Sequence, residues 1–377
     1  MILIFFLIYS VQSIQKLKLL SVPTSNYYNV QYYTTFSVGT PGQVFTAIID
    51  SGSYLLWIPS ISINCESCNK FNDSLSSTYT PLDKHHSINY IGGYVEGKFS
   101  LDSIKISGLT SKTTQFLLVD YEKNLKQLAS DGILGLGYNG KENLKYSLVY
   151  NLYLEGQIGQ PVFAIDFNSQ NEDSYIYIGG YESEKIREKV AFELKVFEDF
   201  YSWSGVFNGV KFGSVEINDY NVLFFDTGLT FFSGPEKLVK MIFEEIGGIL
   251  ECTESSYLKC KCSKGSILQL PQLFFKFDSG ELRIGPENYI GYSQGTCTVM
   301  ILKTEYMHWG AGMGFFREYF TVFNYSDARI TFYQKSEVVE ASFFSAYLCV
   351  GIIAVALLKV YNKETKPNYY ARINDIQ

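Results

Sequence analysis

The sequence predicts an all-β protein of two related halves, followed by one C-terminal transmembrane helix. Three observations support this prediction. Short runs of β-branched and aromatic residues alternate with clusters of Gly, Asn, Asp and Ser, which is typical of strands joined by turns. A chain of 377 residues suggests about two domains. An acidic turn comes after an apolar run in each half, "DSG" at Asp50 and "DTG" at Asp226.

The first element is the apolar N-terminal stretch "MILIFFLIYSVQS", residues 1–13. It is too short to span a bilayer stably, and the small residues Val11 and Ser13 are placed as at a signal-peptidase site. The sequence therefore predicts a cleaved signal peptide and entry into the secretory pathway.

Three Asp-Ser/Thr-Gly turns differ in the residues on their C-terminal side. Asp278 lies in "LFFKFDSGELRI", where charged residues flank the turn, so we expect an exposed hairpin. Asp50 and Asp226 lead into apolar sequence, "SYLLWIPS" and "LTFFSGP", which predicts buried turns. Two buried acidic turns in a two-domain chain indicate an internal duplication in which each half gives one carboxylate to a shared site. Two carboxylates brought close together hold one proton between them and can act as base and acid toward a bound water.

Cysteine usage fits an oxidising compartment, because six of the seven cysteines precede the C-terminal apolar segment and Cys349 lies within it. The "NCESC" stretch suits half of a zinc site or a redox pair, but with three histidines in the chain we expect a disulfide loop between Cys65 and Cys68. Cys262 and Cys297 are also expected to be disulfide-bonded. Three pairings among the last four lumenal cysteines remain open: Cys252, Cys260, Cys262 and Cys297. Asn72 and Asn324 are glycosylation acceptors in sequence.

The last element, residues 341–360, is an apolar stretch of about 20 residues, the length of a transmembrane helix. Basic residues after it, Lys363, Lys366 and Arg372, place the C-terminus in the cytosol. The sequence thus predicts a single-pass type I protein of an endosomal, vacuolar or cell-surface membrane, with the preceding domain lumenal or extracellular. The net charge of −7 and the pI of 5.2 argue against a nucleic-acid partner.

Residues 27–335 resemble the pepsin-like aspartic proteases. The resemblance rests on "YYTTFSVGTPGQVFTAIIDSGSYLLWIPS", "FNDSLSSTY", "DGILGLGY" and "FFREYFTVFNYSDARITFY". It implies the bilobal pepsin-like acid protease fold, in which two related β-barrel lobes have a cleft between them. It also implies hydrolysis of protein or peptide substrates by a monomer, without metal or cofactor. The expected organisation is a signal peptide at 1–13, a short pro-segment remnant or linker at 14–25, an N-terminal lobe at 26–170, a C-terminal lobe at 171–335, a stalk at 336–340, the transmembrane helix at 341–360 and a cytosolic tail at 361–377.

The resemblance also implies roles for particular residues. Asp50 and Asp226 would be catalytic. The two loops would be supported by Ser51, Gly52, Ser53, Thr227 and Gly228. A flap hairpin, "SINYIGGYVEGKFSLDSI", would cover the cleft, with Tyr90 reaching toward Trp57 and with Gly92 and Gly93 making the turn mobile. Ile133 would line the primary substrate pocket.

Two departures from the family pattern concern the surroundings of the second aspartate. Leu229 stands where a hydroxyl residue is usual, and Met313 stands where an aspartate is common. Loss of a hydroxyl donor is expected to raise the pKa of Asp226. These departures keep open an alternative, a catalytically inactive pepsin-fold membrane protein that binds peptides or partners.

Overall fold

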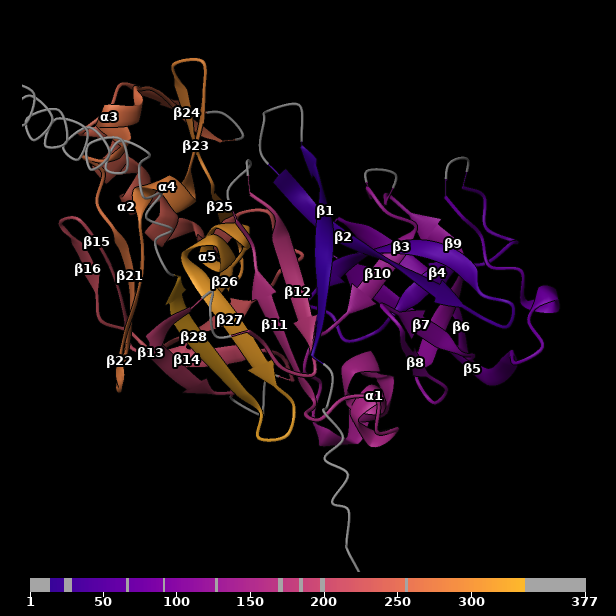
Figure 1. Cartoon of the computed structure of the whole chain (residues 1–377). Helices are drawn as coiled ribbons and strands as arrows, with labels where there is room; N and C mark the ends of the chain where they lie inside the picture. The colour runs from indigo at the N-terminus through magenta and orange to yellow at the C-terminus, as the bar shows by residue number, and fades with distance from the viewer. Residues whose placement is uncertain are drawn as a thin grey trace, which may run out of the picture. The chain divides into compact units, whose positions relative to one another are not determined.

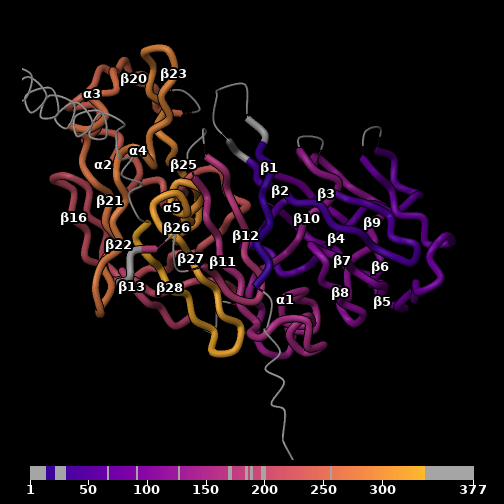
Figure 2. The backbone as a smooth tube through the Cα atoms, in the orientation of Figure 1, coloured from indigo at the N-terminus to yellow at the C-terminus, as the bar shows by residue number. Residues whose placement is uncertain are grey.

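The computed structural model describes residues 14–23, 29–65, 68–90, 92–125, 128–168, 172–182, 186–196, 201–254 and 257–335. These residues belong to one compact unit that ends at Lys335, and their secondary structure is mostly β (Figures 1 and 2). The predicted signal peptide, stalk, transmembrane helix and cytosolic tail lie outside the described residues. Within the described part of the chain, no helix is long and apolar enough to cross a membrane.

The first half is a run of neighbouring strands in one sheet. Their order is β2 (Asn29–Val38), β3 (Gln43–Asp50), β10 (Gly132–Gly135), β4 (Trp57–Pro59), β9 (Gln115–Lys123), β6 (Gly93–Leu101) and β5 (Thr80–Tyr90). Strand β7 (Ile104–Ile106) pairs with β2 and with β8 (Leu109–Ser111). Side chains of β3 alternate between the two faces of the sheet. Phe45, Ala47 and Ile49 pack in one apolar cluster, and Ile48 packs in another. The 3₁₀ helices η1 (Asp73–Leu75) and η2 (Lys141–Tyr146) and helix α1 (Leu148–Leu154) complete this half.

The second half is built from smaller sheets. One has the order β14 (Ser204–Phe207), β17 (Asn221–Phe225), β26 (Trp309–Ala311), β18 (Phe232–Pro235) and β25 (Ile301–Thr304). Another is β16 (Val215–Ile217), β15 (Gly209–Phe212), β21 (Leu273–Phe277) and β22 (Gly280–Ile284), and a further one is β19 (Cys252–Glu254), β20 (Leu258–Lys261), β24 (Thr296–Val299) and β23 (Ile290–Ser293). The helices that join them are α2 (Glu236–Gly247), α3 (Lys264–Ile267), α4 (Pro286–Tyr289) and α5 (Met313–Glu318).

The two halves repeat one strand arrangement around the two acidic turns. Strand β10 runs parallel to β3 and antiparallel to β4, and β9 runs parallel to β4. Likewise β26 runs parallel to β17 and antiparallel to β18, and β25 runs parallel to β18. Asp50 ends β3, and Asp226 comes directly after β17. The predicted internal duplication is therefore visible in the strand pairing.

Strands from both halves meet in the middle of the large sheet. Beyond β1 (Gln15–Pro23), the sheet continues with β12 (Ser174–Ile178), β11 (Val162–Asp166), β27 (Tyr319–Asn324), β28 (Arg329–Lys335) and β13 (Ile186–Lys195) (Figure 1). The lobe boundary expected at residue 170 falls between the paired strands β11 and β12. Hydrogen bonds to Leu136 link the two halves. Its carbonyl accepts from the Trp203 indole (2.7 Å) and from the Tyr325 hydroxyl (2.6 Å).

The segment 14–25, predicted from sequence to be a pro-segment remnant or linker, contains strand β1 (Gln15–Pro23). This strand pairs with β12 and with β2. Leu17 and Leu19 are buried, while Lys16 and Lys18 form ion pairs with residues from later in the chain, Glu182 (2.9 Å) and Asp173 (2.7 Å). The alternation of Lys and Leu therefore belongs to a strand with one buried face.

The disulfides resolve the pairing that the sequence left open. Cys65 is bonded to Cys68, as predicted, and Cys262 is bonded to Cys297. The remaining pair is Cys252 with Cys260, which face each other across β19 and β20.

Candidate active site

The first acidic turn holds Asp50 in a set of hydrogen-bond donors. Asp50 is 6% exposed. Its Oδ1 atom accepts from the backbone N–H of Gly52 (2.9 Å) and Ser53 (3.3 Å), and its Oδ2 atom accepts from the Ser53 hydroxyl (2.5 Å). Donors of this kind stabilise a negative charge on a buried carboxylate.

The second acidic turn is similar in backbone but not in side chains. The Asp226 backbone N–H donates to Ala311 in β26 (3.0 Å), and the Gly228 N–H donates to Asp226 Oδ1 (2.7 Å). Gly137 N–H donates to the Ser53 carbonyl (2.7 Å), and in the same way Met313 N–H donates to the Leu229 carbonyl (2.9 Å). Leu229 is thus the counterpart of Ser53 and has no hydroxyl to donate to the aspartate.

Ser51 and Thr227 link the two turns by four buried hydrogen bonds. Each backbone N–H donates to the other residue's hydroxyl oxygen, at 2.9 Å in both directions. The Ser51 hydroxyl donates to the Phe225 carbonyl (2.9 Å), and the Thr227 hydroxyl donates to the Ile49 carbonyl (2.7 Å). Buried polar groups satisfied in this reciprocal way fix the relative position of the two turns.

The loop glycines show how closely the carboxylates approach each other. A Cβ atom added at Gly52 would lie 2.3 Å from Cγ of Asp226. A Cβ atom added at Gly228 would lie 2.8 Å from Oδ1 of Asp50 and 3.1 Å from Oδ1 of Asp226. Each carboxylate therefore occupies the space over the opposite loop, which only glycine leaves free.

Burial and the neighbouring charge raise the pKa of Asp226 well above the usual range for aspartate. Desolvation is the largest cause, the negative charge of Asp50 is the second, and the Gly228 N–H opposes both. Because two carboxylates at this separation resist double ionisation, the arrangement favours one shared proton.

Tyr90 connects the hairpin of β5 and β6 to the Asp50 turn. Its hydroxyl accepts a hydrogen bond from the Trp57 indole (2.9 Å) and lies within hydrogen-bonding reach of Ser53, which bonds Asp50. Burial is the main reason that the pKa of Tyr90 is raised, and the Asp50 charge adds to it. The hydroxyl thus stays protonated as a donor.

The two flap glycines have different surroundings. A Cβ atom at Gly92 would meet nothing within 4 Å, whereas one at Gly93 would lie 2.6 Å from the Lys123 carbonyl. Gly93 is thus needed for the close approach of β6 to β9.

Ile133 lies in an apolar cluster beneath this hairpin. It is buried, pairs with Trp57 between β10 and β4, and shares the cluster with Val95 and Leu125.

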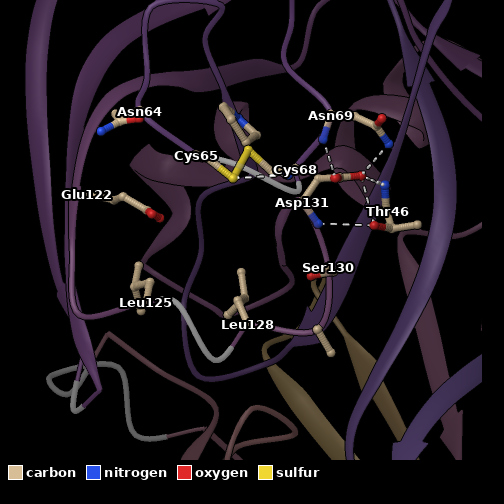
Figure 3. Close-up of a pocket in the computed structure, with 12 residues that line it drawn as sticks. Thr46, Asn64, Cys65, Cys68, Asn69, Glu122, Leu125, Leu128, Ser130 and Asp131 are labelled. Carbon is tan, nitrogen blue, oxygen red and sulfur yellow. Dashed lines mark hydrogen bonds between the residues drawn. A yellow bond between two sulfur atoms is a disulfide. The ribbon is translucent and has the colours of Figure 1, made fainter.

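The adjacent Asp131 was not singled out from the sequence, although it belongs to the "DGIL" stretch. Its carboxylate accepts from the Asn69 N–H (2.7 Å) and amide (3.1 Å) and from the Thr46 N–H (2.8 Å) and hydroxyl (2.9 Å). These bonds fix the position of Asp131, which directly precedes β10. Asp131 is also one of the residues that line a pocket of about 460 Å³ (Figure 3).

Other predicted features lie away from this group. Asp278 is exposed in the hairpin of β21 and β22, as predicted, and accepts a hydrogen bond from Asn208 (2.6 Å). The Asn72 side chain caps η1 by accepting from Ser74, and the Asn324 side chain accepts from Ser326 N–H (2.8 Å). Over the described ranges, no group of three His, Cys, Asp or Glu residues could hold a metal ion.

Comparison with known proteins adds to this geometry. The family model of eukaryotic aspartyl proteases matches residues 31–335. Pepsin A of Bos taurus is 29% identical over 321 residues, which cover 82% of this chain and 85% of the relative. Pepsin A of Sus scrofa is 28% identical over 323 residues, 82% of each chain. Vacuolar protease A of Neurospora crassa is 29% identical over 284 residues, 73% of this chain and 70% of the relative. These matches confirm the predicted pepsin-like fold, and the chain belongs to the eukaryotic aspartyl protease family.

Proposed function

We propose that this protein is an aspartic endopeptidase that hydrolyses peptide bonds of proteins through a water activated by Asp50 and Asp226. The observation that carries the proposal is the mutual approach of the two carboxylates over Gly52 and Gly228. Both carboxylates come from one chain, so a monomer suffices.

The asymmetry of the two turns supports different roles for the two carboxylates in the resting enzyme. Ser53 gives Asp50 a hydroxyl donor, whereas Leu229 gives Asp226 none, and the pKa of Asp226 is raised. We therefore assign the shared proton to Asp226 and the role of base to Asp50, which has the additional hydroxyl donor. Ser51 and Thr227 hold the carboxylates in this geometry.

The reaction is derived from these roles. Asp50 takes a proton from the water as its oxygen attacks the scissile carbonyl carbon, and Asp226 donates its proton to the carbonyl oxygen. The tetrahedral intermediate collapses when the proton held by Asp50 passes to the nitrogen and the C–N bond breaks. Asp226 recovers its proton from the intermediate's hydroxyl, so no covalent enzyme intermediate forms.

The substrate would lie between the carboxylates and the hairpin of β5 and β6. Tyr90 and Gly92 would cover it, Gly93 would set the hairpin's approach to β9, and Trp57 and Ile133 would line the primary pocket. Closure of such a hairpin excludes water other than the nucleophile.

Cleavage of a peptide library by the full chain tests the proposal. We expect pepstatin-sensitive cleavage in which one ¹⁸O atom from labelled water enters the new carboxyl group. Asp50→Asn and Asp226→Asn should each lose cleavage while keeping the native circular dichroism spectrum. Peptide binding without cleavage by the wild-type chain would instead favour the alternative of an inactive peptide-binding protein.

We also infer that the chain is anchored as a type I membrane protein of the secretory pathway. The support is the apolar segment 341–360 with basic residues after it, the signal-like N-terminus, and three disulfides in the described region. One relative is named a vacuolar protease. Resistance of the full chain to carbonate extraction, lost on deletion of residues 341–377, is expected; extraction of the full chain would contradict anchoring.

A further inference from the structure

A second cavity, of about 800 Å³, lies in the second half of the chain and is lined by neither Asp50 nor Asp226. Its main walls are the end of β16 with the turn into β17, the start of α2, and the connection from β25 to β26. Every residue of these segments is among those the structure describes. Its volume is in the range of small-molecule sites, roughly 300 to 1,000 Å³.

The walls of this cavity are mainly apolar. Phe207 and Val210 contribute from β14 and β15, and Leu238 and Met241, which lie three residues apart on α2, face it from the helix. Leu238 and Met241 are only partly buried, as expected of side chains next to an open space. An apolar ligand would bury this surface.

Trp309 in the wall has an unsatisfied polar group. Its side chain is fully buried, and its indole N–H has no hydrogen-bond partner among the described residues. The other two tryptophans donate, Trp57 to the Tyr90 hydroxyl and Trp203 to the Leu136 carbonyl. A buried donor left unpaired costs about 1–3 kcal/mol. The nitrogen has almost no accessible surface, so Trp309 contributes to the wall without offering this donor to a ligand in the cavity.

The charged residues that line the cavity are mostly acidic. They are Asp219, Glu236 and Glu305, against Lys237 alone, and all four are exposed. Glu236 is paired with Lys240 (2.8 Å), whereas no ion pair or hydrogen bond of the Asp219 or Glu305 carboxylate is formed within the described part of the chain. A cation at the mouth would therefore be attracted to two free carboxylates.

The remaining wall adds an aromatic surface without positive charge. Tyr306 is 58% exposed and stacks on His308 at 5.2 Å between ring centroids. Burial lowers the pKa of His308, so this ring is neutral at pH 7. Met307 beside it is 76% exposed. Exposed aromatic and methionine side chains are typical of adaptable binding surfaces.

We propose that this cavity binds a cationic amphiphile, whose apolar body lies against Leu238 and Met241 and whose ammonium group faces Asp219 and Glu305. The site is independent of the proposed peptidase chemistry. It adjoins the strands that hold the second acidic turn, because β26 carries both Trp309 and Ala311, the acceptor of the Asp226 N–H.

Photolabelling of the full chain in non-ionic detergent tests this site. The probe is a fatty amide of a diamine with a diazirine on its acyl chain, and the matched probe carries a carboxylate in place of the ammonium group. We expect saturable labelling within residues 235–241 and 304–309, competed by the unlabelled amide, and at least tenfold weaker labelling by the carboxylate probe. Met241→Arg should weaken labelling at least tenfold, whereas Leu268→Arg, at a residue 74% exposed next to another helix, should not.

A charge reversal that leaves the core untouched separates binding from misfolding. Asp219→Lys combined with Glu305→Lys changes only exposed side chains and should reverse the preference in favour of the carboxylate probe. Labelling that does not saturate, that maps elsewhere, or that is unchanged by Met241→Arg would overturn the cavity as the site. An unchanged preference in the charge-reversal variant would overturn the cationic ligand.

Discussion

Gly52 faces the carboxyl group of Asp226 so closely that an added Cβ atom would lie 2.3 Å from Asp226 Cγ. The two residues belong to different halves of the chain, and the hydrogen bonds between Ser51 and Thr227 hold them in place. The position of one carboxylate is therefore determined by the loop of the other. This relationship makes the pair sensitive to changes far smaller than removal of an aspartate.

Gly52→Ala is expected to lower kcat/KM by roughly 100-fold, or about 2.7 kcal/mol, because the methyl group displaces the Asp226 carboxylate. The matched control is Gly247→Ala at the end of α2, where an added Cβ meets nothing within 4 Å. Peptide cleavage by the two variants checks this. Equal activity of Gly52→Ala and wild type would show that the carboxylates are not confined by the loops.

Thr227→Val is expected to lower the free energy of unfolding by about 2–5 kcal/mol, because the Ser51 N–H and the Ile49 carbonyl each lose a buried partner. The valine has nearly the same shape, so packing is kept. Thr253→Val, at an exposed position of β19, should change stability by no more than about 0.5 kcal/mol. Urea unfolding of both variants measures the two changes in the free energy of unfolding. Similar changes in the two variants would argue against a stabilising role for the hydrogen bonds between Ser51 and Thr227.

Tyr90→Phe is expected to lower kcat/KM by about 10- to 100-fold, because the Trp57 indole loses its acceptor and Ser53 loses a neighbouring hydroxyl. Tyr94→Phe is the control on the same hairpin, since its hydroxyl donates to the side chain of Glu96 at the surface. Steady-state cleavage of one peptide by both variants measures the loss of kcat/KM in each. A loss as large in Tyr94→Phe would assign the effect to the hairpin as a whole.

Leu229→Ser tests the asymmetry between the two turns. A serine hydroxyl in the position equivalent to Ser53 would donate to Asp226 and stabilise its ionised form, so the pKa of Asp226 should fall. Both limbs of the pH profile of kcat/KM should then move to lower pH, which Leu229→Ala, lacking a donor, should not produce. A profile that is unchanged or moved upward would show that residue 229 does not tune the pair.

The candidate site was largely predictable because its signal is local. An acidic turn between two apolar stretches must be buried, and Asp50 and Asp226 share that pattern while Asp278 does not. Long-range pairing was not predictable. Strand β1 depends on β12 and on ion pairs to Glu182 and Asp173, none of which the sequence near Gln15 reveals.

Further features depended on tertiary contacts in the same way. The choice of Cys260 as the partner of Cys252 depends on the β19–β20 register. The role of Gly93 depends on the Lys123 carbonyl of a neighbouring strand. The repeated strand pairing also shows that Leu229 corresponds to Ser53, an equivalence based on backbone hydrogen bonds from Met313 and Gly137.

The pH dependence of kcat/KM for the wild type, Asp50→Asn and Asp226→Asn tests most directly whether the two carboxylates share one proton. Since activity requires the singly protonated pair, the wild-type profile should be bell-shaped, with a limb for loss of the shared proton and a limb for gain of a second. Each asparagine variant should lack activity across the whole range, because it cannot be both base and acid. A bell-shaped or single-limbed profile that survives in either asparagine variant would contradict a shared proton.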